Sequence, residues 1–150
     1  MEYKTPACAE DYLRRFEMDE STVDPIKICH ALGIKVITYR KAKELIEALG
    51  FSKFTEGNDG FCVMLRKRPV IFYDDETTTP ERQRSTIAHE LGHFANGDFE
   101  HDSTPCMGHC CDKCREWKAD SFAFRLLFPD PTVGTRYAAK PKTKERSDPQ

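Results

Sequence analysis

Apolar positions in the first third of the chain follow helical spacing in some stretches and extended spacing in others. The spacing of Tyr12, Leu13 and Phe16 predicts an amphipathic helix over residues 1–20. Alternating β-branched residues predict a strand over Ile34–Tyr39. Two further helices are expected, one from Asp24-Pro25 to Gly33 and one from Lys41 to Leu49, where Gly50 ends it.

The middle of the chain has the pattern of a β-hairpin followed by a long helix. Two apolar runs of strand length, Phe61–Leu65 and Val70–Tyr73, flank the polar link Arg66–Pro69. A helix start follows in Thr77–Glu81, which offers a hydroxyl N-cap, a proline for the first helical position and an early acid. Asn96-Gly97 is a suitable stop for that helix.

Together these elements predict an α+β fold, a single compact domain with a small mixed or antiparallel sheet packed on helices. A chain of 150 residues suits one domain with a buried core. Within it, residues 1–20 are expected to form an N-terminal helix or extension, and residues 21–136 the main domain. Residues 137–150, rich in lysine, proline and polar residues, are expected to be a disordered tail.

Composition and charge argue against some classes of function. The formal net charge of −2 gives no bulk attraction to nucleic acid, and the basic stretches Arg66–Arg68 and Lys140–Arg146 are weak support for DNA binding. No apolar run is long enough to span a membrane, and the first residues do not resemble a signal peptide. Seven cysteines without a secretion signal favour a reducing compartment. We therefore expect a cytoplasmic protein with neither a membrane nor a nucleic-acid partner.

The most informative motif is His89-Glu90-Leu91-Gly92-His93. On a helix, His89 and His93 lie on one face and can bind one metal ion, while Glu90 is placed to take a proton from water as a general base. Ile87, Leu91 and Phe94 supply the apolar face of this helix. Gly92 costs about 1 kcal/mol relative to alanine inside a helix, which indicates that another part of the chain approaches closely there.

A second apolar helix is expected to open at Glu116-Trp117-Lys118-Ala119-Asp120 and to run to Phe128-Pro129. Glu116 and Asp120 are i, i+4 neighbours on one face. Two histidines and a glutamate form an established ligand set for catalytic zinc, so Glu116 is the candidate third ligand. Asp120 is the candidate acceptor for the second ring N–H of one histidine. An ordinary solvated pair of carboxylates is the alternative.

With both motifs in view, the chain resembles the ImmA/IrrE-type metallopeptidases. The segments Arg84–His93 and Glu116–Pro129 are similar to the two helices that carry that family's motifs, and Val23–Val36 is similar to its opening helix and strand. The resemblance implies a compact HExxH zincin, often encoded on phage or integrative mobile elements. It also implies His89, His93 and Glu116 as ligands with Glu90 as base, and helix-turn-helix repressors as substrates.

A cysteine-rich insertion over residues 98–114 is the part least like that family. It contains Cys106, His109, Cys110, Cys111 and Cys114, and Cys111-Asp112-Lys113-Cys114 is a metal- or redox-type pair. The cluster could hold a second, structural Zn²⁺, remain as loop thiols, sense oxidation, or place one thiolate on the catalytic metal. The sequence leaves these alternatives open.

The motifs and the resemblance together predict a zinc-dependent metallo-endopeptidase, with Mn²⁺ as an alternative metal. The resemblance implies that it acts on a repressor, as an anti-repressor. The chemistry is metal-assisted hydrolysis of a peptide bond with Glu90 as general base. His101, His109 and Tyr137 are candidates for stabilising the oxyanion by residue type alone. A peptide substrate is expected to lie along one of the hairpin strands. The alternative function is a metal-stabilised binding module that inactivates a repressor without cleaving it.

Overall fold

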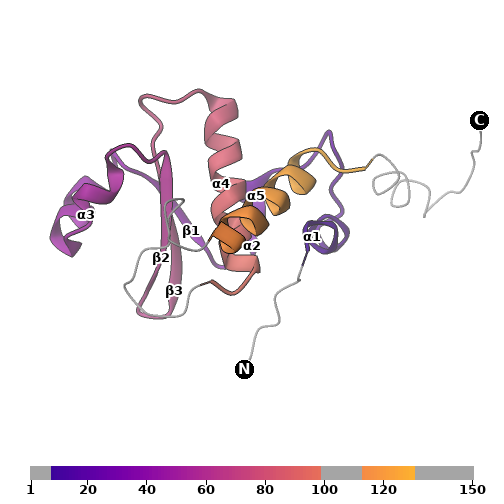
Figure 1. The fold of residues 1–150 in the computed structure, drawn as a ribbon, viewed down its shortest axis with the longest axis horizontal. Helices are drawn as coiled ribbons and strands as arrows, with labels where there is room; N and C mark the ends of the chain where they lie inside the picture. The colour runs from indigo at the N-terminus through magenta and orange to yellow at the C-terminus, as the bar shows by residue number, and fades with distance from the viewer. Residues whose placement is uncertain (1–7, 99–112, 131–150) are drawn as a thin grey trace, which may run out of the picture.

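A computed structural model describes residues 8–98 and 113–130 of the chain. The elements, in chain order, are α1 (Ala9–Arg15), α2 (Pro25–Ala31), β1 (Lys35–Thr38), α3 (Lys43–Leu49), the 3₁₀ turn η1 (Ser52–Thr55), β2 (Gly60–Leu65), β3 (Arg68–Tyr73), α4 (Pro80–Ala95) and α5 (Lys113–Leu127) (Figure 1).

The three strands form one mixed sheet in the order β1-β3-β2. β2 and β3 are the antiparallel arms of the predicted hairpin, with Phe61 opposite Phe72. β1 joins the other side of β3 in parallel, starting with Lys35 opposite Val70. That ladder starts after Pro69, which has no N–H to donate. The predicted α+β class is confirmed, and the sheet is the mixed one of the two expected forms.

Each face of this sheet is covered by helical structure. One core lies between the sheet and the four helices α1, α2, α4 and α5, and includes Cys62 and Ile71. The other core lies on the opposite face, against α3 and η1, and includes Val63 and Phe72. Because alternate residues of each hairpin strand enter different cores, both strands are nearly continuously apolar.

The ends of α4 and α5 set the geometry of the site described below. At the start of α4 the Thr79 hydroxyl accepts a hydrogen bond from the N–H of Arg82, and Pro80 occupies the first helical position, as predicted. α4 and α5 then pack side by side and make the most extensive contact between any two elements of the described chain (Figure 1). α5 begins at Lys113, one turn earlier than expected, so Glu116 lies inside its first turn.

Two local expectations are corrected. The N-terminal helix stops at Arg15, and Glu17 follows in the left-handed region with φ 54°, so it does not continue towards residue 20. The hairpin link is the two-residue turn Arg66-Lys67, both residues having positive φ, while Arg68 and Pro69 already belong to β3. A two-residue turn with positive φ at both positions matches the twist of the two strands, and it forms here without the glycine that such turns usually contain.

No helix within residues 8–98 and 113–130 is long and apolar enough to cross a membrane. The expected tail over residues 137–150 and most of the cysteine-rich insertion lie outside the described residues. The predicted domain limits therefore remain predictions.

Candidate metal centre

The two motif histidines lie one turn apart on α4, as their spacing predicts. Their ring centroids are 4.9 Å apart and the ring planes are nearly perpendicular. His93 is fully buried, whereas the His89 side chain keeps 18% of its surface exposed. The pair therefore has one ring inside the protein and one at its surface.

Gly92 lets α5 approach these histidines. A Cβ atom at this position would lie 3.0 Å from the carbonyl oxygen of Ala119 and 3.2 Å from the Cβ of Phe122. The close approach expected from a glycine inside a helix is thus confirmed, and the neighbour is the backbone of α5. It places Glu116, one turn earlier on α5, over the pair of imidazoles.

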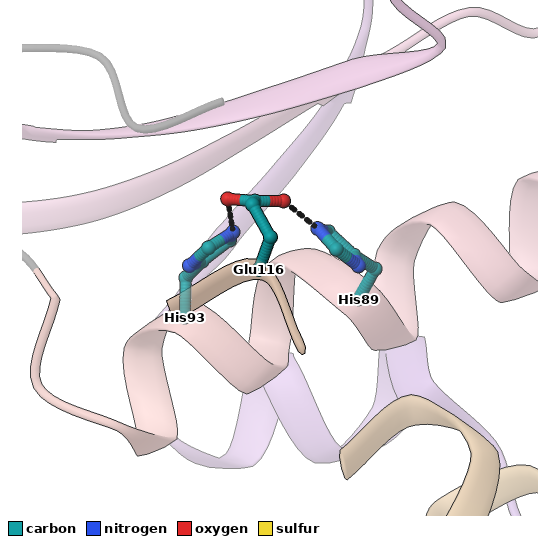
Figure 2. Close-up of side chains that lie close together, drawn as sticks. All are labelled: His89, His93 and Glu116. Carbon is teal, nitrogen blue, oxygen red and sulfur yellow. Dashed lines mark hydrogen bonds and ion pairs between the residues drawn. The ribbon is translucent and has the colours of Figure 1, made fainter. Parts of the chain in front are cut away.

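The carboxylate of Glu116 spans both rings (Figure 2). Its Oε1 lies 3.1 Å from His89 Nε2, and its Oε2 lies 3.0 Å from His93 Nε2. For tetrahedral zinc with ordinary bond lengths, two such ligand atoms are about 3.4 Å apart. His89, His93 and Glu116 form the one group within the described residues whose ligand atoms are close enough to share an ion.

The remaining ring nitrogens face carboxylates as well. His89 Nδ1 lies 2.8 Å from Asp120 Oδ1, and His93 Nδ1 lies 2.8 Å from Asp98 Oδ2. Because a carboxylate can only accept a hydrogen bond, the neutral tautomer that suits these two contacts carries its proton on Nδ1, which leaves Nε2 with a lone pair. Asp120 thus has the contact that its position predicted, and the two lone pairs point at the Glu116 oxygens.

Asp98 is the member of this site that sequence reasoning missed. α4 ends in a Schellman motif: Gly97, with φ 74°, donates its N–H to Phe94, and the N–H of Asp98 donates to the carbonyl of His93. The turn brings the residue after the glycine back onto the last helical turn. An acid directly after Asn96-Gly97 is therefore the sequence signal for this contact, whereas residue 98 is assigned on sequence alone to the cysteine-rich insertion.

Asp98 also links the two helices. Its other oxygen, Oδ1, lies 3.8 Å from the guanidinium Nε of Arg115, the residue before Glu116. Its side chain is only 8% exposed. One buried carboxylate thus contacts a histidine of α4 and an arginine of α5.

The donor set fits a zinc ion. Two imidazole lone pairs and a carboxylate converge on one point, and these groups would repel each other unless a cation or a proton lay between them. Glu116 Oε2 is buried, and no group in residues 8–98 or 113–130 donates a well-aligned hydrogen bond to it. Nitrogen and carboxylate ligands of this kind suit Zn²⁺, and a three-residue set leaves a position open.

Glu90 lies beside this centre without belonging to the convergent set. Its side chain is 3% exposed, and together with His89 and Asp120 it lines a cleft of about 450 Å³. Burial, and then the charge of Glu90, raises the pKa of the Tyr39 phenol, so Tyr39 stays protonated. The Tyr39 hydroxyl donates to the carbonyl of Asn58, in the loop at the rim of the same cleft.

Comparison with known proteins agrees with this geometry. A family model described as the IrrE N-terminal-like domain, a peptidase family, matches residues 29–146. This chain belongs to that family. The match includes both helices of the centre and supports assignment to the ImmA/IrrE metallopeptidases. No curated protein matches the chain.

The cysteine cluster of this family member can be placed only in part. Cys114 is exposed in the first turn of α5, two residues before Glu116. Cys106, His109, Cys110 and Cys111 lie outside the described residues, as do His101 and Tyr137. A second zinc and an oxyanion-stabilising group therefore remain predictions.

Proposed function

We propose that this chain is a zinc-dependent endopeptidase in which His89, His93 and Glu116 hold the ion and Glu90 is the general base. One observation carries the proposal: two imidazole Nε2 atoms and one carboxylate converge, beside a buried glutamate that reaches an open cleft. A purely structural zinc site needs neither the open position nor the adjacent base. Manganese is the alternative ion.

Each residue has one task in this proposal. When bound, the ion lowers the pKa of a water molecule and polarises the scissile carbonyl. Glu90 accepts the proton of that water and passes it to the leaving amine. Asp98 and Asp120 keep the Nδ1 protons of the two histidines in place, so that both Nε2 lone pairs stay available.

The proposed substrate is a helix-turn-helix repressor that is cleaved in the cytoplasm. Cleavage would end the repression of its target genes. The choice of substrate rests on the resemblance to the ImmA/IrrE family, because described members of that family act on such regulators. A cleft of the size found beside Glu90 can take a short extended segment of a protein chain.

The test is the isosteric variant Glu90→Gln, compared with wild type after both are loaded with zinc. Loss of a general base should lower the rate of peptide cleavage by about 10²- to 10⁴-fold. Bound zinc, measured by elemental analysis, should stay at the wild-type level because Glu90 is not a ligand. An empty site in the variant would mean that Glu90 binds the metal.

The same variant identifies the substrate. Glu90→Gln used as bait in extracts of the source cells should retain the substrate, which mass spectrometry identifies. Wild type should then cut the purified partner at one position, and Glu90→Gln should not. If both proteins inactivate the partner equally and neither cuts it, the chain is a binding module instead.

A further inference from the structure

The cleft beside Glu90 has one apolar wall, which comes from α5. Ala123, Phe124, Leu127 and Phe128 line it, and all lie C-terminal to Asp120. Phe124 and Phe128 are one turn apart with ring centroids 5.4 Å from each other. The apolar wall therefore starts next to Asp120, which contacts His89, and continues along the end of α5 to Phe128, one residue beyond the helix.

Both aromatic rings are exposed, which is costly for side chains of this size. Phe124 is 64% exposed and Phe128 62% exposed. Of the four large apolar side chains exposed in the described residues, these two are the ones in the cleft. Neither ring is needed to fill a core, so the pair is available to a ligand.

The opposite wall of the cleft is polar. It consists of the loop Gly57–Gly60 and the first turns of α4, where Ser85 and Thr86 face the cleft. Gly60 has no room for a side chain, because a Cβ there would lie 2.6 Å from Thr86 Cγ2. Arg82 forms an ion pair with Asp59 on this wall. A peptide could place its backbone against the polar wall and a side chain against the apolar one.

We infer that Phe124 and Phe128 determine specificity: they bind a large apolar side chain of the substrate next to the bond that is cut. The inference deepens the proposed function and rests on it. The ligand class is set by the two walls, because the rings offer apolar contact, while Glu90 and Asp120 line the same cleft and repel acidic side chains. Asp59 and Arg82 also line the cleft, but they neutralise each other as an ion pair and add no net charge.

The test uses two probes that bind zinc and differ in one side chain, N-acetyl-phenylalanine hydroxamate and N-acetyl-glycine hydroxamate. Their dissociation constants are measured by calorimetry on the zinc-loaded full chain. The phenylalanine probe should bind wild type about tenfold more tightly, since a benzyl group buried in part on two rings gains about that factor. In the double variant Phe124→Ser/Phe128→Ser the two probes should bind within about threefold of each other.

Trp117→Ser is the matched control. Trp117 is an exposed aromatic residue of the same helix, but it lines a separate hollow, with Cys8 and Ser121, rather than the cleft. This variant should keep the tenfold preference, and zinc content should be the same in all three proteins. Because both phenylalanines are exposed, the double substitution should leave the packing of the core unchanged.

The outcomes separate this inference from the proposed function. If wild type binds zinc and both hydroxamates equally well, or if the double variant keeps the preference, the aromatic pair does not select the side chain and only this inference fails. If wild type binds no zinc, the metal centre is wrong, and the proposed function and this inference fail together.

Discussion

The two sides of the metal centre make the same contact in different surroundings. On the closed side, His93 and Asp98 are 0% and 8% exposed; on the open side, His89 and Asp120 are 18% and 72% exposed. Both pairs have an Nδ1-to-oxygen distance of 2.8 Å. A hydrogen bond to a charged group is stronger away from water, so equal distances do not mean equal contributions.

This difference in exposure indicates that the two sides have different roles. The closed side holds one proposed ligand, His93, firmly in place, because Asp98 is tied to it by the helix end and also contacts Arg115 on α5. The open side lies in the cleft with Glu90, where a substrate can reach it. Rigidity and access are thus supplied by different histidines, and substitutions on the two sides should differ in size.

The largest effect is expected at Glu116, which contacts both sides. Glu116→Ala removes a proposed ligand, so zinc affinity should fall by well over 100-fold, more than for the loss of an outer hydrogen-bond partner. Asp120→Ala should lower affinity less than this. Competition with a chromophoric chelator measures both. The reverse ranking would mean that the roles of the two carboxylates are exchanged.

The direct test of the comparison is Asp98→Asn against Asp120→Asn. Each change keeps the shape of the side chain and removes its charge. We expect zinc affinity to fall by about 100-fold for Asp98→Asn and by about tenfold or less for Asp120→Asn, within the usual range for such partners. Equal losses, measured by the same competition, would show that burial does not distinguish the two sides.

The spacing of the two helices can be tested at Gly92. In an ordinary helix interior, Gly→Ala stabilises by about 1 kcal/mol. Here the new methyl group would meet the backbone of Ala119 at 3.0 Å, so we expect Gly92→Ala to destabilise the fold by about 1–3 kcal/mol. Urea unfolding gives the sign. A stabilised variant would show that α5 can move away without cost.

The smallest effect is expected from the cysteine cluster, which we predict to be separable from catalysis. In the proposed site His89, His93 and Glu116 already supply three ligands, and a cysteine held in the fourth position would exclude water. The double variant Cys111→Ser/Cys114→Ser should therefore keep its zinc at the histidine site. Total zinc should fall towards one equivalent only if a second site exists, as elemental analysis would show.

Two results would instead mean that a cysteine of the cluster binds the ion at the histidine site. Loss of all zinc from that double variant, or a sulfur–zinc bond at His89 and His93 seen by X-ray absorption, would contradict separability. An enzyme inhibited by its own thiol would then explain the data better.

Much of α4 could be predicted because its signals are local. Thr79 and Pro80 start the helix, Gly97 ends it, and the four-residue spacing of His89 and His93 puts both rings on one face. Capping bonds and helical periodicity depend only on near neighbours in the chain. The same holds for the hairpin strands, although their turn used two residues, Arg66 and Lys67, that carry no turn signal.

The sequence by itself thus determined the elements, the histidine pair with its adjacent base, and the carboxylates available to it. Only the tertiary structure decided that β3 lies in the middle of the sheet, that Gly92 admits α5, and that His93 is buried while His89 meets the cleft. Burial depends on which helices pack against each other, through contacts between residues far apart in the chain. Because of that packing, His89 and His93 have different surroundings, although they are the same residue type and lie four positions apart on one helix.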